Sequence, residues 1–282
     1  MSKSVLITGC TPGGIGHSLA REFKSKNFRV FATARKAASI SDLEQQGIET
    51  LSLEVTSSES VKALKDEVTS RTGGTLDILV NNAGRNYTVP ALDVEMEEIR
   101  QTFEANLFGV MAMCQAFAPL LVEAKGTIVQ IGSLAGIMPY VFGSVYNASK
   151  AALHSYSDTL RVELAPFDVK VVTVVTGGVK SNIARTHRDL PPNSIYLPLS
   201  EEYKQRLTHS QAMGIPNEEY ARTVVKQVLG NPGKTQVWAG GSSVLVWFVS
   251  NFLPKWVLGF VMTRMFKLWK LRGTYQYQKK VQ

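Results

Sequence analysis

The chain has 282 residues, of which 44% are hydrophobic and 19% are charged, a balance typical of a folded globular protein. Its formal net charge is +8, but ten of the 31 basic residues and none of the 23 acidic residues lie in 220–282. This uneven placement argues against a nucleic-acid partner, for which basic residues would line a folded face. Cys10 and Cys114 make neither a metal-binding spacing nor a disulfide framework, so we expect no metal site and a reducing, intracellular location.

Short β-rich runs alternate with amphipathic stretches along most of the chain. The predicted strands are residues 5–8, 29–33, 48–53, 76–80, 126–131 and 170–175, with 236–239 as a candidate last strand. The predicted helices are 17–25, 60–71, 97–121, 146–164 and 201–210. This alternation predicts an α/β fold with a doubly wound parallel sheet covered by helices on both faces. We place a single domain at 1–241 and an apolar, basic extension at 242–282.

A glycine-rich turn follows the first predicted strand and precedes the first predicted helix. Glycine allows a tight turn and lets the backbone approach a pyrophosphate, while the helix N-terminus offers free N–H groups to phosphates. The alternative is a plain strand-to-helix turn without a ligand. The residues predicted to contact the phosphates are Gly9, Thr11, Gly14, Ile15 and Gly16.

Two basic residues, Arg35 and Lys36, end the second predicted strand. In a dinucleotide-binding fold an acidic residue here binds the ribose hydroxyls of NAD, whereas an arginine suits the 2′-phosphate of NADP. We therefore predict NADPH/NADP+ as the cofactor, with Arg35 on the 2′-phosphate and Lys36 assisting. The alternative is that both are solvated loop charges.

Tyr146 and Lys150 form the candidate acid/base pair. A spacing of four residues puts both side chains on one face of the predicted helix. A free tyrosine has a pKa of about 10, and a nearby ammonium lowers it. The phenol can then protonate a carbonyl oxygen as hydride arrives, or deprotonate an alcohol in the reverse direction.

Two further polar residues, Ser133 and Asn106, are candidates for the same site. Ser133 lies just past the strand at 126–131, where its hydroxyl can hydrogen-bond the reacting oxygen or cap a turn. Asn106 lies in the preceding predicted helix. There it either holds a water beside Lys150 and extends a proton path, or is a satisfied core amide.

These signals, together with residues 81–84 after the fourth strand, occur in the order and spacing of the short-chain dehydrogenase/reductase family, which the chain resembles over about 4–240. The resemblance implies a Rossmann-like fold, a nicotinamide cofactor and the catalytic roles given above, with Lys150 also on the nicotinamide ribose. It implies further cofactor contacts from Glu54, Asn82, Ala83, Gly84, Val179 and Ser181.

The chain departs from the family pattern at three places. Pro12 and Gly13 add one residue to the glycine turn, so the turn must bulge. Glu54 stands where the family usually has an aspartate near adenine. Thr176 and Gly177 follow the sixth strand where the family usually shows Pro-Gly, and Ser181 replaces a common threonine.

Within the family, the chain resembles fungal NADPH-dependent 1-acyldihydroxyacetone-phosphate reductases at 126–129, 132–136, 142–146, 176–179 and 190–196. This likeness implies a lipophilic carbonyl substrate that carries a phosphate. Lys180, Arg185, His187 and Arg188 either meet that phosphate or are solvated loop charges. The alternative substrates are a steroid, a retinoid or a fungal secondary metabolite such as a polyketide. A remote alternative is a catalytically silent NADP(H)-sensing protein.

Residues 244–262 are strongly apolar and are followed by basic residues. Polar residues and Pro254 interrupt the run, whereas a spanning helix needs ~20 apolar residues. We predict an interfacial helix or hairpin on the cytosolic face of the endoplasmic reticulum or on a lipid droplet, and otherwise a cytoplasmic protein. The alternatives are a subunit interface or a flap over the substrate pocket. The family resemblance also implies a homodimer or homotetramer, formed through helices 97–121 and 146–164.

Overall fold

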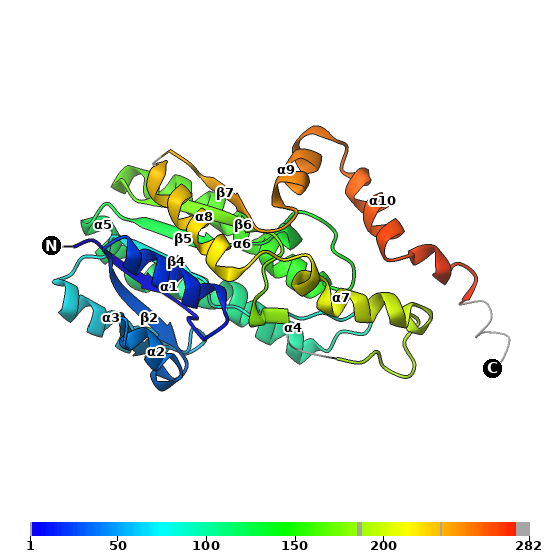
Figure 1. The fold of residues 1–282 in the computed structure, drawn as a ribbon, viewed down its shortest axis with the longest axis horizontal. Coiled ribbons are helices and arrows are strands. Elements are labelled where there is room, and N and C mark those ends of the chain that lie inside the picture. Colours follow the sequence, from blue (N-terminus) through cyan, green and yellow to red (C-terminus); the bar gives the residue numbers. More distant parts are fainter. Residues whose placement is uncertain (1, 185–187, 232, 275–282) are drawn as a thin grey trace.

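A computed structural model describes residues 2–184, 188–231 and 233–274, and one parallel sheet forms its centre (Figure 1). The strand order is β3-β2-β1-β4-β5-β6-β7. The strands are β1 Ser4–Ile7, β2 Arg29–Ala34, β3 Glu49–Ser52, β4 Ile78–Asn81, β5 Thr127–Ile131, β6 Lys170–Thr176 and β7 Gln236–Ala239. The order reverses between β1 and β4, and such a switch point places a ligand site at the carboxyl ends of the strands.

Helices cover both faces of this sheet. α1 (Ile15–Ser25) and α8 (Asn217–Gly230) lie side by side on one face. α3 (Ser58–Thr72), α5 (Gly109–Glu123) and α6 (Ser144–Leu164) cover the other. The sequence-based expectation of a Rossmann-like, doubly wound α/β fold is therefore confirmed.

The alternation of side chains along β1 shows how one strand serves two cores. Val5 and Ile7 are buried against the α1 and α8 face, whereas Leu6 is buried on the opposite side. Successive strand side chains point to opposite faces, so a strand covered on both sides must be apolar throughout.

The predicted helix 97–121 is longer and less regular than expected. It runs from Met96 to Glu123 as α4 (Met96–Phe103), a π-helical turn η2 (Glu104–Phe108) and α5. By length and composition alone this helix could cross a membrane, but half of its most apolar stretch is buried inside the protein. Its buried side chains belong to the core between α3, α5 and the sheet, so a core helix explains its composition.

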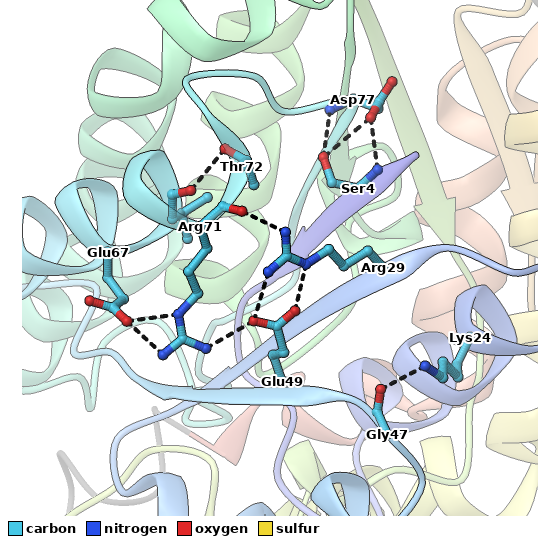
Figure 2. A network of polar contacts seen from close by, with 10 residues as sticks. Ser4, Lys24, Arg29, Gly47, Glu49, Glu67, Arg71, Thr72 and Asp77 are labelled. Carbon is cyan, nitrogen blue, oxygen red and sulfur yellow. Dashed lines mark hydrogen bonds and ion pairs between the residues drawn. The ribbon is translucent and has the colours of Figure 1, made fainter. Parts of the chain in front are cut away.

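A polar network fixes the edge of the sheet at which the strands begin (Figure 2). Arg29 Nε donates to Glu49 Oε1 at 2.6 Å, and Arg71 reaches Glu49 Oε2 at 2.9 Å. Ser4 N donates to Asp77 Oδ2 at 2.7 Å, which ties β1 to the start of β4. The carboxyl edge, where the glycine turn lies, is left for the functional site.

The C-terminal segment, which we call the tail, forms two short helices, α9 (Ser243–Phe252) and α10 (Trp256–Met265). They are followed by the 3₁₀ turn η7 (Leu268–Leu271). Figure 1 shows this segment beyond β7, at the end of the molecule that carries α7 (Ser200–Ala212). The interruption expected at Pro254 is present. Met262 and Phe266 are buried in a cluster with Phe142 and Tyr203, which agrees with the flap alternative.

The other side of this segment is an exposed apolar surface. The outward side chains that are more than half exposed are Val244 (71%), Leu245 (64%), Phe252 (62%), Trp256 (68%) and Phe260 (52%). We call these five side chains the tail face.

Candidate active site

The glycine turn can hold a dinucleotide phosphate. Gly9 has φ +72°, and a Cβ there would lie 2.9 Å from Ala83 Cα. A Cβ on Gly16 would lie 2.5 Å from Gly9 O, so neither position has room for a side chain. Gly14 caps α1 without a side-chain hydrogen bond, and no acidic residue lies in its first turn. The N–H groups and the positive end of the helix dipole are thus available to an anion.

The extra residue in this turn forms the expected bulge. Gly14 N donates to Thr11 O at 3.0 Å, and Gly13 has φ +73°. Gly13 O accepts from Asn182 N at 3.2 Å and from Asn217 Nδ2 at 3.2 Å. The bulge therefore ties the glycine turn to the segment after β6 and to the start of α8.

The residues after β4 hold the glycine turn in place through hydrogen bonds to Thr8 and Gly9. Thr8 Oγ1 accepts from Asn82 N at 3.0 Å and from Ala83 N at 2.9 Å. Asn82 Nδ2 donates to Thr8 O at 2.8 Å and to Gly9 O at 2.9 Å. These bonds tie the segment after β4 to the end of β1 and to the glycine turn.

Arg35 and Lys36 lie at the carboxyl end of β2 and are both exposed. Neither has a carboxylate at ion-pair distance within the described part of the chain. They are placed where a 2′-phosphate of a dinucleotide would be met. The Glu54 carboxylate accepts from Thr56 N at 3.3 Å and from Thr56 Oγ1 at 3.0 Å, so it caps the turn before α3.

Val179 and Ser181 lie on the segment that follows β6, and both are buried. Val179 pairs with Ile215 in an isolated bridge. Gln211 of α7 donates to Ser181 O. Gly177 has no room for a side chain, because a Cβ there would lie 2.2 Å from Gly241 O. Gly177 thus lets this segment pack against the chain leading into the tail.

Lys150 and Tyr146 lie one turn apart on α6, as predicted, but their electrostatics differ from the expectation. Lys150 Nζ donates to Ile131 O at 2.8 Å and lies 5.9 Å from the centroid of the Tyr146 ring. Burial lowers the pKa of Lys150 to about 8. Burial raises the pKa of Tyr146, and a hydrogen bond with Ser133 and the charge of Arg206 oppose that rise. The sequence led us to expect a lowered pKa for Tyr146, whereas in this structure desolvation by burial outweighs the neighbouring groups and raises it.

Ser133 combines the two roles that the sequence left open. Its Oγ accepts from Ala135 N at 3.1 Å and so caps the 3₁₀ turn η3 (Leu134–Gly136). Ser133 also acts on Tyr146, whose pKa it lowers against the effect of burial. Sequence reasoning missed His154, which holds the backbone of Ser133 in place because its Nε2 accepts from Ser133 N at 3.2 Å. Burial lowers the pKa of His154 to about 4, so the ring is neutral at physiological pH.

The Asn106 side chain is a satisfied core amide. Its Oδ1 accepts from Arg85 N at 2.8 Å, and its Nδ2 donates to Arg85 O at 2.9 Å and to Ser149 Oγ at 3.0 Å. Both amide protons are used, so the side chain positions the segment after Gly84 instead of donating to a water. Asn106 lies within the π-helical turn η2, an irregularity often found at functional sites.

The loop cations expected to meet a substrate phosphate are placed differently. Arg188 NH2 lies 3.0 Å from Glu98 Oε2, and its guanidinium stacks on Tyr87 at 4.7 Å. Lys180 is exposed, whereas Arg185 and His187 lie outside the described residues. The cation that does approach the site is Arg206 of α7, and no motif in the sequence pointed to it.

These parts define a class of protein. A glycine turn at a helix N-terminus suits a dinucleotide, and a tyrosine with a serine and a lysine beside it suits proton transfer to or from an oxygen. No cluster of metal-ligating side chains lies within the described ranges. The site is that of a nicotinamide-dependent oxidoreductase.

Comparisons with known proteins agree with this class. The family model for short chain dehydrogenases matches residues 3–191. A short-chain dehydrogenase of Aspergillus ruber is 41% identical over 283 residues, covering 100% of this chain and 99% of that protein. An NADPH-dependent 1-acyldihydroxyacetone phosphate reductase of Schizosaccharomyces pombe is 41% identical and covers 84% of this chain and 86% of its own. The solved structure of a short-chain dehydrogenase from Streptomyces avermitilis has a TM-score of 0.77 at 27% identity, covering 97% of this chain and 98% of that one.

The chain therefore belongs to the short-chain dehydrogenase/reductase family, whose members are oxidoreductases that use NAD(P).

Proposed function

We propose that this protein uses NADPH to reduce a ketone on a lipophilic substrate, namely 1-acyldihydroxyacetone phosphate to 1-acylglycerol 3-phosphate. The observation that carries the reaction type is Tyr146 on α6, with Lys150 Nζ 5.9 Å from its ring and Ser133 acting on its pKa, at the sheet edge that also holds the glycine turn. The likeness to the Schizosaccharomyces pombe reductase supports the substrate.

Three residues of the site have separate roles in the proposed reduction. The nicotinamide cofactor supplies the hydride when it is bound. Tyr146, whose pKa is raised by burial, is the group that protonates the carbonyl oxygen in the reductive direction and deprotonates the alcohol in the reverse direction. Ser133 orients the same oxygen, and Lys150 positions the nicotinamide ribose.

Two features support NADPH as the preferred cofactor. Arg35 and Lys36 are exposed cations at the end of β2, where a carboxylate would favour NAD. The related reductase of Schizosaccharomyces pombe is named for NADPH.

An apolar wall beside the catalytic segment supports a lipophilic substrate. Phe142 packs edge-on against Tyr203 at 5.5 Å and against Phe266 at 6.0 Å. These rings belong to one buried cluster that joins the segment before α6, α7 and the tail. The partly buried apolar side chains packed against this cluster, among them Met138, Leu190 and Tyr196, are the ones left to contact an acyl chain, since burial of apolar area favours binding by roughly 25 cal/mol per Å².

The test is NADPH oxidation by wild type and Tyr146→Phe against a panel of ketones. The panel contains an acyldihydroxyacetone phosphate, a steroid ketone, retinal and a polyketide ketone. We expect a strong preference for the first and a loss of at least about a hundredfold in kcat with Tyr146→Phe. Preference for another ketone would replace the proposed substrate. If wild type turned over none of them but bound NADPH, the protein would be a cofactor-sensing protein.

We further propose that the tail face binds peripherally to a lipid surface, at the cytosolic side of the endoplasmic reticulum or on a lipid droplet. Exposed apolar residues of the tail face lie next to Lys255 and Arg264, and 220–282 contain no acidic residue. Such a combination suits an anionic interface.

We expect Leu245→Glu with Trp256→Glu to abolish flotation with vesicles of phosphatidylcholine and phosphatidylserine. The control is Leu92→Glu, an equally exposed apolar residue outside the tail. Unchanged flotation of the tail variant would contradict the proposal.

We also propose a homodimer or homotetramer that uses α4, α5 and α6. Two apolar side chains are exposed here, Phe108 (49%) in the turn η2 between α4 and α5 and Val162 (74%) on α6. Light scattering of Val162→Glu should show a smaller particle than wild type, and an unchanged mass would move the interface elsewhere.

A further inference from the structure

Glu98 lies between two arginines that belong to segments far apart in the sequence. It stands in the first turn of α4, and its side chain is 20% exposed. Its Oε2 accepts a hydrogen bond from Arg85 NH2 and lies 3.0 Å from Arg188 NH2. Arg85 follows Gly84 in the segment after β4, whereas Arg188 lies on the chain after β6. One carboxylate oxygen therefore joins these two segments.

The Arg85 side of this contact reaches the catalytic lysine. Arg85 N donates to Asn106 Oδ1 at 2.8 Å, and Asn106 Nδ2 donates to Arg85 O at 2.9 Å. Asn106 also donates to Ser149 Oγ, directly before Lys150 on α6. A Cβ on Gly84 would lie 2.8 Å from Asn106 Oδ1 and 3.9 Å from Lys150 Nζ. The segment after β4 thus passes beside the Lys150 ammonium, and its backbone is fixed there without help from the Arg85 side chain.

The Arg188 side of the contact reaches the start of α6. The guanidinium of Arg188 stacks on Tyr87 at 4.7 Å. Tyr87 is buried in a cluster with Val145, which lies directly before the catalytic tyrosine. Further along the same segment, Tyr196 packs edge-on against Phe142 at 6.1 Å. The segment that begins at Arg188 therefore runs from Glu98 to the apolar wall beside the catalytic residues.

The Glu98 carboxylate separates two cations that would otherwise repel each other. Guanidinium groups stay charged in proteins, and like charges at short range oppose each other. Arg188 Nε is buried without a hydrogen-bond partner in the described ranges, so Glu98 carries a large part of the docking of this side chain. Arg85 keeps Gln101, whose Oε1 accepts from its NH1 at 2.5 Å. Neutralisation of Glu98 should therefore release Arg188 and leave Arg85 in place.

We propose that Glu98 is a positioning residue that holds segment 188–196 against the residues after β4 and so shapes the ketone side of the site. The inference rests on the proposed reaction, but it holds for any ketone that Tyr146 protonates. Ser194 Oγ hydrogen-bonds Asp93 Oδ2 further along the same segment, so Glu98 fixes the end at Arg188. Loss of the Glu98 contact should weaken binding of the ketone and leave the cofactor contacts at the glycine turn intact.

The kinetic test compares wild type with Glu98→Gln, which keeps the size of the side chain and removes its charge. We expect KM for the ketone that wild type prefers to rise roughly three- to tenfold, the worth of a partly exposed charged hydrogen bond. KM for NADPH and kcat should stay within about twofold. A loss of folded protein would instead lower kcat and leave both KM values unchanged. Glu97→Gln is the matched control, because Glu97 is 67% exposed and contacts Arg100 on its own helix at 3.9 Å. An unchanged KM for the ketone, or equal changes in both KM values, would overturn the proposal.

A double variant tests whether Glu98 acts through Arg188. Arg188→Met should raise KM for the ketone by about the same factor as Glu98→Gln. The two changes together should raise it no further, because the second removes a contact that is already lost. Effects that multiply would show that the two residues act independently, and the proposal would then be wrong.

Hydrogen–deuterium exchange separates failure of this inference from failure of the proposed function, because it needs no turnover. Backbone bonds such as Ser194 N to Pro191 O at 2.9 Å and Leu199 N to Tyr196 O at 2.8 Å protect amides in and next to the segment. We expect peptides from 188–199 to exchange several-fold faster in Glu98→Gln and Arg188→Met than in wild type or Glu97→Gln, with the strands unchanged. If wild type reduced no ketone but showed this difference, the proposed reaction would fall and the role of Glu98 would stand. If exchange were the same in all four proteins, the role of Glu98 would be wrong whatever the substrate.

Discussion

At the scale of single residues, the proposed preference for NADPH rests on Arg35. It is exposed at the end of β2 and has no carboxylate partner in the described part of the chain, so its charge is available to a 2′-phosphate. We expect Arg35→Leu to raise KM for NADPH by roughly ten- to a hundredfold, the worth of a hydrogen bond to a charged group, while KM for NADH stays within about twofold. Steady-state kinetics with both cofactors measure this. Lys125→Leu, at the opposite edge of the sheet, is the control, and a parallel rise for both cofactors would contradict the assignment.

Single residues also show what a sequence can and cannot reveal about a site. Tyr146 and Lys150 could be found because a spacing of four on one helix brings them together locally. His154 and Arg206 could not, because their roles depend on packing between distant segments. His154 reaches Ser133 only because Gly132 leaves space, where a Cβ would lie 2.2 Å from Nε2. The hydrogen bond from the Lys150 ammonium to Ile131 O could not be predicted either, because the folding of the sheet brings that carbonyl to it.

At the scale of elements, the bulged glycine turn can be tested with a matched pair of substitutions. Gly13 and Gly73 have nearly the same φ, +73° and +70°, but only Gly13 is crowded, with a Cβ falling 2.9 Å from Asn182 Nδ2. We expect Gly73→Ala to lower the free energy of unfolding by about 1 kcal/mol through backbone strain alone. Gly13→Ala should cost more and also raise KM for the cofactor, because it displaces Asn182 and the turn. Thermal unfolding and steady-state kinetics report the two effects. Equal results for both variants would show that the bulge does not couple the turn to Asn182.

The elements themselves were largely predictable because their periodicity is local. The predicted strands agree with β1 to β7 to within two residues, since apolar, β-branched runs buried on both sides leave a strong pattern. The π-helical turn η2 within 97–121 left no such pattern. Within this turn Asn106 hydrogen-bonds Arg85, a contact with a separate segment that no local pattern encodes.

At the scale of the whole molecule, ion pairs to Glu202 of α7 join the tail to the part of the molecule beside the candidate active site. Its side chain is 2% exposed, whereas those of Lys267 and Lys270 are about half exposed, at 47% and 43%. The hydrogen bond from Lys270 contributes most to holding the pKa of Glu202 below its usual value. A lowered pKa means that the pairing stabilises the folded state at neutral pH and is lost as the pH falls below about 4.

We therefore expect Glu202→Gln to loosen the tail while leaving the sheet folded. Removal of the charge should weaken docking by about 1 kcal/mol, and trypsin should then cut after Lys267 and Lys270 several-fold faster at pH 7.5. The neighbouring Glu201→Gln is the control, because Glu201 is 79% exposed and its 3.8 Å contact with Lys204 involves only α7. Since Phe266 packs on Phe142 beside the site, the loosened tail should also raise KM for a long-chain ketone more than for a short one. Unchanged cleavage in Glu202→Gln would mean that the apolar cluster around Phe266 holds the tail without help from the ion pairs.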